Sequence, residues 1–156
     1  MPVEVIDESG GQAADSLVAQ IHAAAGVILG ALGHRDKELG VSLVDDARIR
    51  ALNRQWRAKD AATDVLSFSQ LEGESVAGPM LGDVVISLET MRRQAGAGGW
   101  SEAEETVRLL LHGVLHLAGH DHERDSDAAA MRAEERRVIA LLAARGIACA
   151  ADEDVA

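Results

Sequence analysis

The chain has 156 residues, 47% of them hydrophobic, which is enough for one domain to bury a core without disulfide staples. Only 2% are aromatic, which disfavours an aromatic platform for stacking nucleic-acid bases. The net charge of −11 argues against broad, non-specific binding of nucleic acid, although it leaves room for a local basic site.

Targeting and membrane signals are absent from the sequence pattern. The first ten residues, "MPVEVIDESG", do not form a signal peptide, and the longest apolar tract, "AAAGVILGALG", is too short to span a bilayer. The single cysteine excludes an internal disulfide and fits a reducing compartment. We therefore expect a cytoplasmic protein without membrane partners, organised as one domain over residues 1–150 with a flexible acidic tail at 151–156.

The periodicity of apolar residues predicts the elements in chain order. Alternation predicts strands at 3–7, 38–46, 64–70 and 81–89. Helical spacing predicts helices at 13–32, from Asp45 or Asp46 to Arg57, at 90–95, at 101–118, and from Ser126 or Asp127 to Gly146. The run "GAGG" is expected to break the chain before Trp100. This order predicts an α+β fold: one domain with a mixed sheet of about four strands packed with about five helices.

The helix predicted at 101–118 opens with a capping box, Ser101 and Glu104, and carries the most informative motif. The stretch "LHGVLHLAGHDHE" holds four of the six histidines. His112 and His116 lie one turn apart beside the apolar stripe, and Gly119 ends the helix so that His122 can return as a third ligand. Three imidazoles with an open fourth position are typical of catalytic zinc, so we expect one zinc ion (Zn2+) per chain.

Three neighbours of these ligands have two interpretations each. His120 either supports the ligands or is merely exposed, and Asp121 either orients a ligand imidazole or forms the turn. Zinc proteases with the same histidine spacing carry a glutamate after the first histidine as general base, where this chain has Gly113. This disfavours peptide hydrolysis. We expect Gly113 to leave space for a phosphodiester; the alternative is that it eases packing of the helix against a strand.

A basic cluster precedes the strand predicted at 64–70. Within twelve residues the chain carries Arg48, Arg50, Arg54, Arg57 and Lys59. Cations of this kind can stabilise the charge that develops on phosphorus oxygens during phosphoryl transfer. Arg92 and Arg93 are expected to extend the cluster. The alternative is a solvated helix surface.

Three segments, "LNRQWRAKDAATDVLSF", "GDVVIS" and "HGVLHLAGHDHE", closely resemble the YbeY family of metal-dependent endoribonucleases, the ribosomal RNA maturation factors. The resemblance spans about residues 38–140. It implies that His112, His116 and His122 bind zinc, that Arg57 is a functional arginine acting with His112 and His116 in catalysis, and that Asp83 lies on the strand bordering the cleft. The chain departs from the family pattern at Ala62, usually Pro, and at His120, usually Tyr.

The resemblance implies a zinc-dependent, single-strand-specific endoribonuclease, a hydrolase of phosphodiester bonds with a zincin-like metal site. Its expected partners are single-stranded RNA, ribosomal RNA and the small ribosomal subunit, with roles at the 3′ end of small-subunit RNA and in ribosome quality control. Two alternatives remain: a zinc hydrolase of another substrate class, and a non-catalytic ribosome-assembly module with structural zinc. Lys59, Asp83, His120 and Asp121 are expected to support the site or touch substrate.

Overall fold

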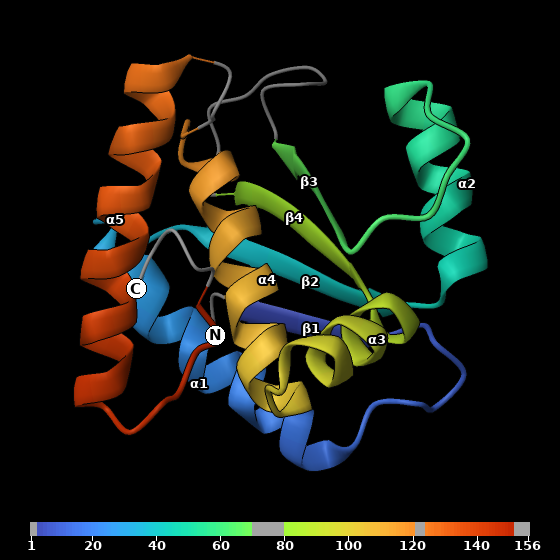
Figure 1. Cartoon of the computed structure of the whole chain (residues 1–156), viewed down its shortest axis with the longest axis horizontal. Helices are drawn as coiled ribbons and strands as arrows, with labels where there is room; N and C mark the ends of the chain where they lie inside the picture. The colour runs from blue at the N-terminus through green and yellow to red at the C-terminus, as the bar shows by residue number, and fades with distance from the viewer. Residues whose placement is uncertain (1–2, 70–79, 121–123, 152–156) are drawn as a thin grey trace.

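The computed structural model describes residues 3–69, 80–120 and 124–151 (Figure 1). These ranges hold four strands and five helices, in the order β1 (Val3–Asp7), α1 (Asp15–Ala31), β2 (Glu38–Val44), α2 (Asp46–Arg57), β3 (Val65–Ser69), β4 (Met80–Ser87), α3 (Leu88–Gly98), α4 (Glu102–Leu117) and α5 (Asp125–Ala144). The predicted single-domain α+β fold is confirmed. Most of the predicted tail, residues 152–156, lies outside the described residues.

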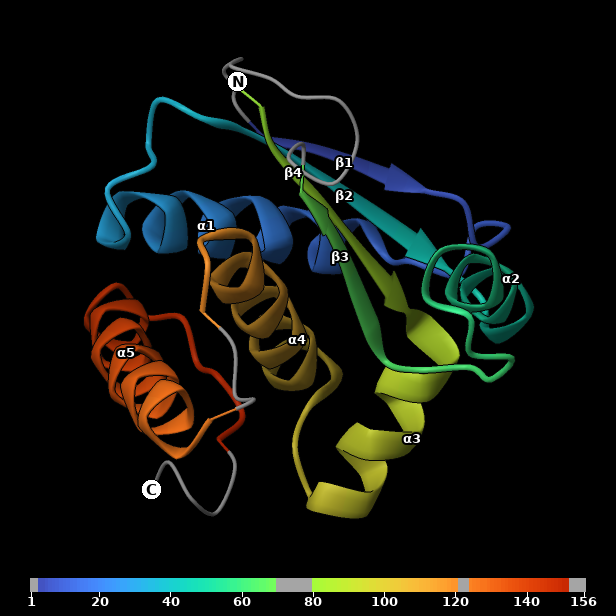
Figure 2. The same ribbon diagram turned by 90° about the horizontal axis from the view of Figure 1, so that it is seen from above.

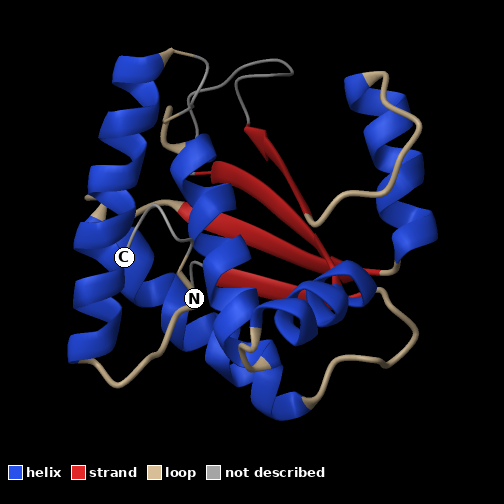
Figure 3. Cartoon of the chain, viewed as in Figure 1, coloured by secondary structure: helices blue, strands red, loops and turns tan. Residues whose placement is uncertain are grey.

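The sheet has the strand order β1-β2-β4-β3 (Figure 3). β1, β2 and β4 are parallel, and β3 pairs antiparallel with β4, so the sheet is mixed. Figure 2 shows α1 and α4 along one face of this sheet, and α5 packs against both of these helices. Within the described ranges, no helix combines the length and apolar character needed to cross a bilayer.

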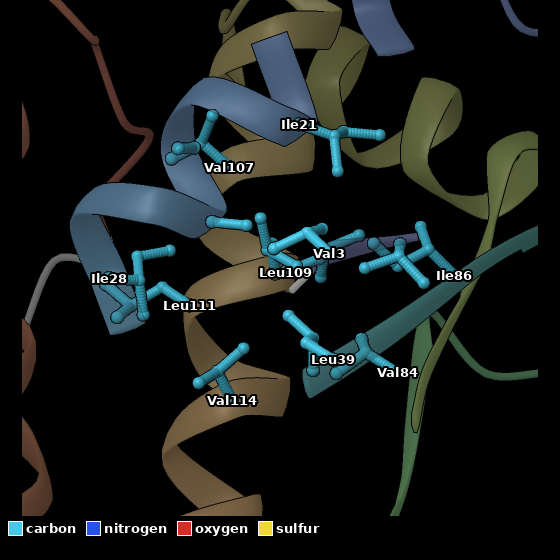
Figure 4. Packing of buried hydrophobic residues seen from close by; sticks show 14 of the residues in the cluster. Val3, Ile21, Ile28, Leu39, Val84, Ile86, Val107, Leu109, Leu111 and Val114 are labelled. Carbon is cyan, nitrogen blue, oxygen red and sulfur yellow. The ribbon is translucent and has the colours of Figure 1, made fainter. Parts of the chain in front are cut away.

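Alternation along the strands divides the buried side chains into two cores. The larger core joins one sheet face to α1 and α4 and includes Ile21, Ile28, Leu39, Val84, Ile86, Leu111 and Val114 (Figure 4). The smaller core lies on the opposite face, where Ile49 of α2 packs on Val44 and Val85. The two helices that carry the predicted site residues, α4 and α2, are therefore held to opposite faces of one sheet.

Two predicted N-caps are present, but α3 and α5 differ from the prediction. α5 begins at Asp125 rather than at Ser126 or Asp127, after Arg124, whose side chain makes no cap hydrogen bond. The Ser101–Glu104 capping box is present, and Asp45 caps α2 by accepting the Arg48 N–H at 2.8 Å. The short helix expected at 90–95 instead runs from Leu88 to Gly98, through most of the predicted "GAGG" break. Glycine weakens a helix without forbidding it, and this one buries Met91 and Ala95, with α4 as its main packing partner. The chain breaks only at Gly99, which takes a left-handed conformation.

Asp46 joins the start of α2 to the start of α3. Its carboxylate accepts hydrogen bonds from the Ser87 and Thr90 hydroxyls, each at 2.6 Å, and from the Arg93 guanidinium at 2.9 Å. Its backbone N–H donates to Glu89 at 2.8 Å. Because Ser87 ends β4, this carboxylate fixes where α2 leaves the sheet.

The Asp46 contacts predict a pH-dependent contribution to stability. Burial raises the pKa of the Asp46 carboxyl, but the hydrogen bonds from Ser87, Thr90 and Arg93 outweigh it, and the net pKa lies below its ordinary value of 3.8. A lowered folded-state pKa gives stability that is present above the unfolded pKa and lost as the pH falls through the folded one. Asp46→Asn should therefore cost roughly 1–3 kcal/mol at pH 7, and the difference from the parent should shrink below pH 4.

Urea unfolding of both proteins at pH 7 and pH 3 measures this difference. Asp36→Asn is the matched control, because Asp36 is exposed in the turn before β2. A penalty for Asp46→Asn that stays constant over this range would contradict the proposed role of the charge.

Candidate active site

His112 and His116 project from α4 into a cavity of about 370 Å³ at the edge of the sheet. Their Nε2 atoms lie 3.1 Å apart, and the two rings meet edge to face. The cavity is walled by one side of α4, by strand β3 and by one arginine, and its lining residues are Arg57, Val65, Leu66, Ser67, Ser69, His112, Gly113, His116 and Leu117. The two imidazoles thus converge on one cavity, and their predicted role as metal ligands stays a prediction.

Arg57 reaches the same cavity from α2, across the edge strand. One guanidinium nitrogen donates to the Ser67 carbonyl at 2.8 Å, and the guanidinium carbon lies 4.8 Å from the centre of the Phe68 ring. The next residue, Ala58, has φ of 58°, and the Lys59 N–H returns to the Asn53 carbonyl at 3.2 Å. This left-handed turn ends α2 at Arg57 and sends the chain toward β3.

A carboxylate stands behind the first histidine. Glu135 Oε1, on α5, lies 3.9 Å from His112 Nδ1, while His112 Nε2 faces His116. The Glu135 side chain is only 15% exposed. A carboxylate on this side can orient the ring and fix which nitrogen carries the proton. Sequence reasoning missed Glu135, because "AEERR" is indistinguishable from a solvated helix until α5 is packed on α4.

A buried polar network fixes the spacing between α4 and β3. Glu105, 2% exposed, is paired with Arg108 through two contacts of 2.9 and 2.6 Å. Gln94 of α3 donates to Glu105 at 2.8 Å and to Asp64, just before β3, at 3.2 Å. Buried charges persist only when paired and hydrogen-bonded. Because Arg108 is one turn before His112, the network anchors the helix where the site begins.

The two imidazoles fit one shared metal ion. Two nitrogens bound tetrahedrally to zinc at about 2.0–2.1 Å are roughly 3.3 Å apart, close to the observed separation. The predicted third ligand, His122, and its neighbour Asp121 lie outside the described residues. Within the described ranges, no group of three or more His, Cys, Asp or Glu side chains is placed to hold a metal. The three-histidine ligand set therefore stays a prediction.

The other predicted supporting residues are placed apart from the imidazoles. His120 follows the left-handed Gly119 that ends the helix, as expected, and its N–H bonds to the Leu115 carbonyl at 3.0 Å. Lys59 is exposed in the turn after α2. Neither is among the residues that line the histidine cavity.

Asp83 lies on the sheet face opposite the histidines. It pairs with Phe68 across the β3–β4 ladder and lines a second cavity, whereas its neighbour Val84 faces α4. Burial raises the pKa of the Asp83 carboxyl, and the negative charge of Glu4 raises it further. No residue of β4 is among those that line the histidine cavity, and the Asp83 carboxylate lines the second cavity instead.

The expected extension of the basic cluster by Arg92 and Arg93 is wrong. Arg93 pairs with Asp46 at the opposite end of α2 from Arg57. Arg92 donates to the Gln12 carbonyl at 2.7 Å and pairs with Glu102 at 3.2 Å. Both side chains tie helices together, and Arg57 is the only described member of the basic cluster that lines the histidine cavity.

The expectation that Gly113 leaves space for substrate is also wrong. Its backbone lines the cavity, but a Cβ atom built there would lie 2.8 and 3.0 Å from the two methyls of Val84 and 3.4 Å from Val65. The side-chain direction therefore points into the sheet. Gly113 serves the close packing of α4, which was the alternative interpretation.

This contact predicts opposite effects for two glycine substitutions within helices. Gly113→Ala should lower the free energy of unfolding by roughly 1–3 kcal/mol, because Val84 is fully buried and cannot easily move. Gly26→Ala, in α1 with nothing within 4 Å of the new Cβ, should raise it by up to about 1 kcal/mol. Adding Val84→Ala to the first variant should relieve the crowding. If Gly113→Ala stabilised the protein as Gly26→Ala does, the close approach would be disproved.

These features define a class: a small α+β domain whose cavity at an edge strand brings an imidazole pair beside an arginine. The fold resembles the solution structure of TM1509 from Thermotoga maritima, with a TM-score of 0.62 and 26% identity, covering 92% of this chain and 91% of that one. The family model "Endoribonuclease YbeY" matches residues 7–143, and the chain therefore belongs to this family. The resemblance noted in the sequence is confirmed.

Relatives named endoribonuclease YbeY support the assignment. The chain is 45% identical to the Pelotomaculum thermopropionicum protein over 148 residues, covering 91% of this chain and 97% of that one. It is 45% identical to a Thermus thermophilus protein over 126 residues, 80% of this chain and 91% of the relative. The Anaeromyxobacter dehalogenans protein is 53% identical over 116 residues, 74% of this chain. The chain spans about 60% of the length of that relative.

Proposed function

We propose that the chain is an endoribonuclease that cleaves single-stranded RNA, with a zinc ion held by His112, His116 and His122. The observation that supports this most directly is the convergence of two imidazole Nε2 atoms and the Arg57 guanidinium on one cavity. The name carried by the family and by the relatives above supports RNA as the substrate.

The residues at the cavity fit a metal-assisted cleavage of a phosphodiester. Zinc bound there would supply Lewis acidity toward a phosphate oxygen. The Glu135 carboxylate, 3.9 Å from His112 Nδ1, would favour the tautomer with the proton on Nδ1 electrostatically, so that Nε2 presents its lone pair to the cavity. Arg57, fixed by Ser67 and Phe68, would neutralise charge that develops on the phosphate oxygens.

The described lining of the cavity argues against peptide hydrolysis. It contains two histidines and an arginine but neither Asp nor Glu. A protease of the zincin type needs a carboxylate as general base beside the first histidine, and Gly113 faces the sheet instead.

We propose that the chain acts in ribosomal RNA maturation, at the 3′ end of the small-subunit RNA, with the small ribosomal subunit as its partner. We also propose a role in ribosome quality control and action in the cytoplasm.

The proposal predicts stoichiometric zinc. The purified protein should carry about one zinc per chain, and the double variant His112→Ala, His116→Ala should lose it. Glu135→Gln should keep the fold and weaken zinc affinity roughly 10- to 100-fold in a competition with a chelator. His34→Ala, in the turn after α1, is the matched control and should keep full zinc. Undiminished zinc in the double variant would rule out this site.

The proposal also predicts a specific role for the Arg57 fork. Arg57→Ala should reduce cleavage of a single-stranded RNA oligonucleotide by roughly 10²- to 10³-fold, with zinc content and melting temperature nearly unchanged. Arg57→Lys should recover only part of the activity, because lysine lacks the planar fork that matches phosphate. Arg54→Ala, exposed on the same helix, controls for loss of charge alone. Parallel losses of stability and activity in Arg57→Ala would favour a structural role.

A further inference from the structure

A second cavity, of about 550 Å³, lies on the sheet face opposite the histidines, between α2 and the strands β2, β3 and β4. Its lining mixes aromatic, basic and polar side chains, among them Trp56, Phe68, Arg48, Arg57, Ser42 and Asp83. The function proposed above uses only Arg57 and its contact with Phe68, and leaves the others unexplained.

The fold gathers two of the chain's three aromatic residues at this cavity. Trp56 and Phe68 meet edge to face, with ring centres 6.4 Å apart. Trp56 is 58% exposed, which leaves a large apolar ring surface toward solvent. The low aromatic content argued against a stacking platform, but clustering matters more than the number of rings, because one exposed ring is enough to stack one base.

Arg57 connects the two cavities. It lines both of them, and Ser69 does the same at the end of β3. Only the edge strand separates the cavities: the Ser67 side of β3 faces the histidines, and Phe68 faces the other way. An RNA strand with a phosphate at Arg57 could therefore pass over the outer edge of β3 and place its next nucleotide against Trp56.

The chemistry of the second cavity fits a nucleobase better than a purely apolar group. A base has a flat face for Trp56 and a polar edge that can hydrogen-bond, and Ser42 and Asp83 supply a hydroxyl and a carboxyl at the sheet side. Arg48 and Arg57 supply positive charge for the flanking phosphates, although the same lining holds the carboxyl groups of Glu8 and Asp83.

We propose that the second cavity binds a nucleobase of the RNA strand being cut, stacked on Trp56, next to the phosphate held at Arg57. The inference rests on the proposed ribonuclease function and adds a subsite to it. The subsite accounts for a preference for single strands, because a base paired in a duplex cannot reach the ring.

Two single-tryptophan variants test the stacking directly. Trp100→Phe leaves Trp56 as the sole tryptophan, and Trp56→Phe leaves Trp100, which is 38% exposed after α3 and does not line the cavity. The probe is a 2′-O-methyl, phosphorothioate-linked oligonucleotide that resists cleavage, compared with an abasic strand of the same backbone. The base-containing strand should quench Trp56 and leave Trp100 unchanged, and the abasic strand should quench neither.

Kinetics supply the second readout. Trp56→Ala should raise KM for single-stranded RNA roughly 5- to 150-fold, the range expected for losing one stacked base, with kcat and zinc content within about twofold of the parent. Trp56→Phe should restore most of the affinity, and Trp100→Ala should change nothing. The parent Trp56 signal keeps the proposal testable even if Trp56→Ala folds poorly.

The outcomes separate the subsite from the function. RNA that binds and is cut without quenching Trp56, or with an unchanged KM in Trp56→Ala, overturns the subsite and leaves the ribonuclease standing. Equal quenching by the abasic strand also overturns it, because the cavity would then recognise backbone or another ligand such as a peptide. Failure of the parent protein to bind or cut RNA at all overturns both proposals together.

Discussion

The position of the candidate site depends on how closely α4 approaches the sheet at Gly113. With no Cβ there, the helix backbone packs directly against the methyls of Val84 and Val65. His112 precedes this contact, and His116 follows one turn later on the same flank, so both imidazoles emerge beside β3. The Glu105–Arg108 pair and Gln94 fix the preceding turn to Asp64. A bulkier residue at 113 would move the histidines away from the strand that completes their cavity.

Arg57 reaches the cavity through independent constraints on the other face of the sheet. The smaller core around Ile49 holds the middle of α2, and Asp46 fixes its start to the end of β4. The left-handed Ala58 ends the helix at the arginine, at a cost of roughly 1–2 kcal/mol for a residue with a Cβ. The cavity thus forms where two separately anchored helices meet at β3. Among the described strands β3 lies at the sheet edge, and residues of β3 line both cavities.

Features governed by local periodicity could be predicted from the sequence, whereas features governed by packing between distant segments could not. The capping box, the strand alternation and the histidine pair each depend on residues within a few positions. Glu135, by contrast, meets His112 only after α5 packs. α3 likewise continues through Gly96 because tertiary contacts bury Met91 and Ala95, which the local sequence does not reveal.

The strongly acidic composition bears on where RNA could approach the two cavities. A chain of charge −11 repels RNA over most of its surface, but at physiological salt this repulsion decays within about 8 Å. The described lining of the histidine cavity has no carboxylate, and Arg57 stands where the cavities meet. Each phosphate contact on a single strand adds only about −0.7 to the slope of the logarithm of the binding constant against the logarithm of the salt concentration. Base stacking is not a charge interaction, so it does not depend on a positively charged surface. An RNA strand would therefore meet the least electrostatic repulsion where Arg57 lies between the two cavities, which is also where the proposed subsite would let a base stack.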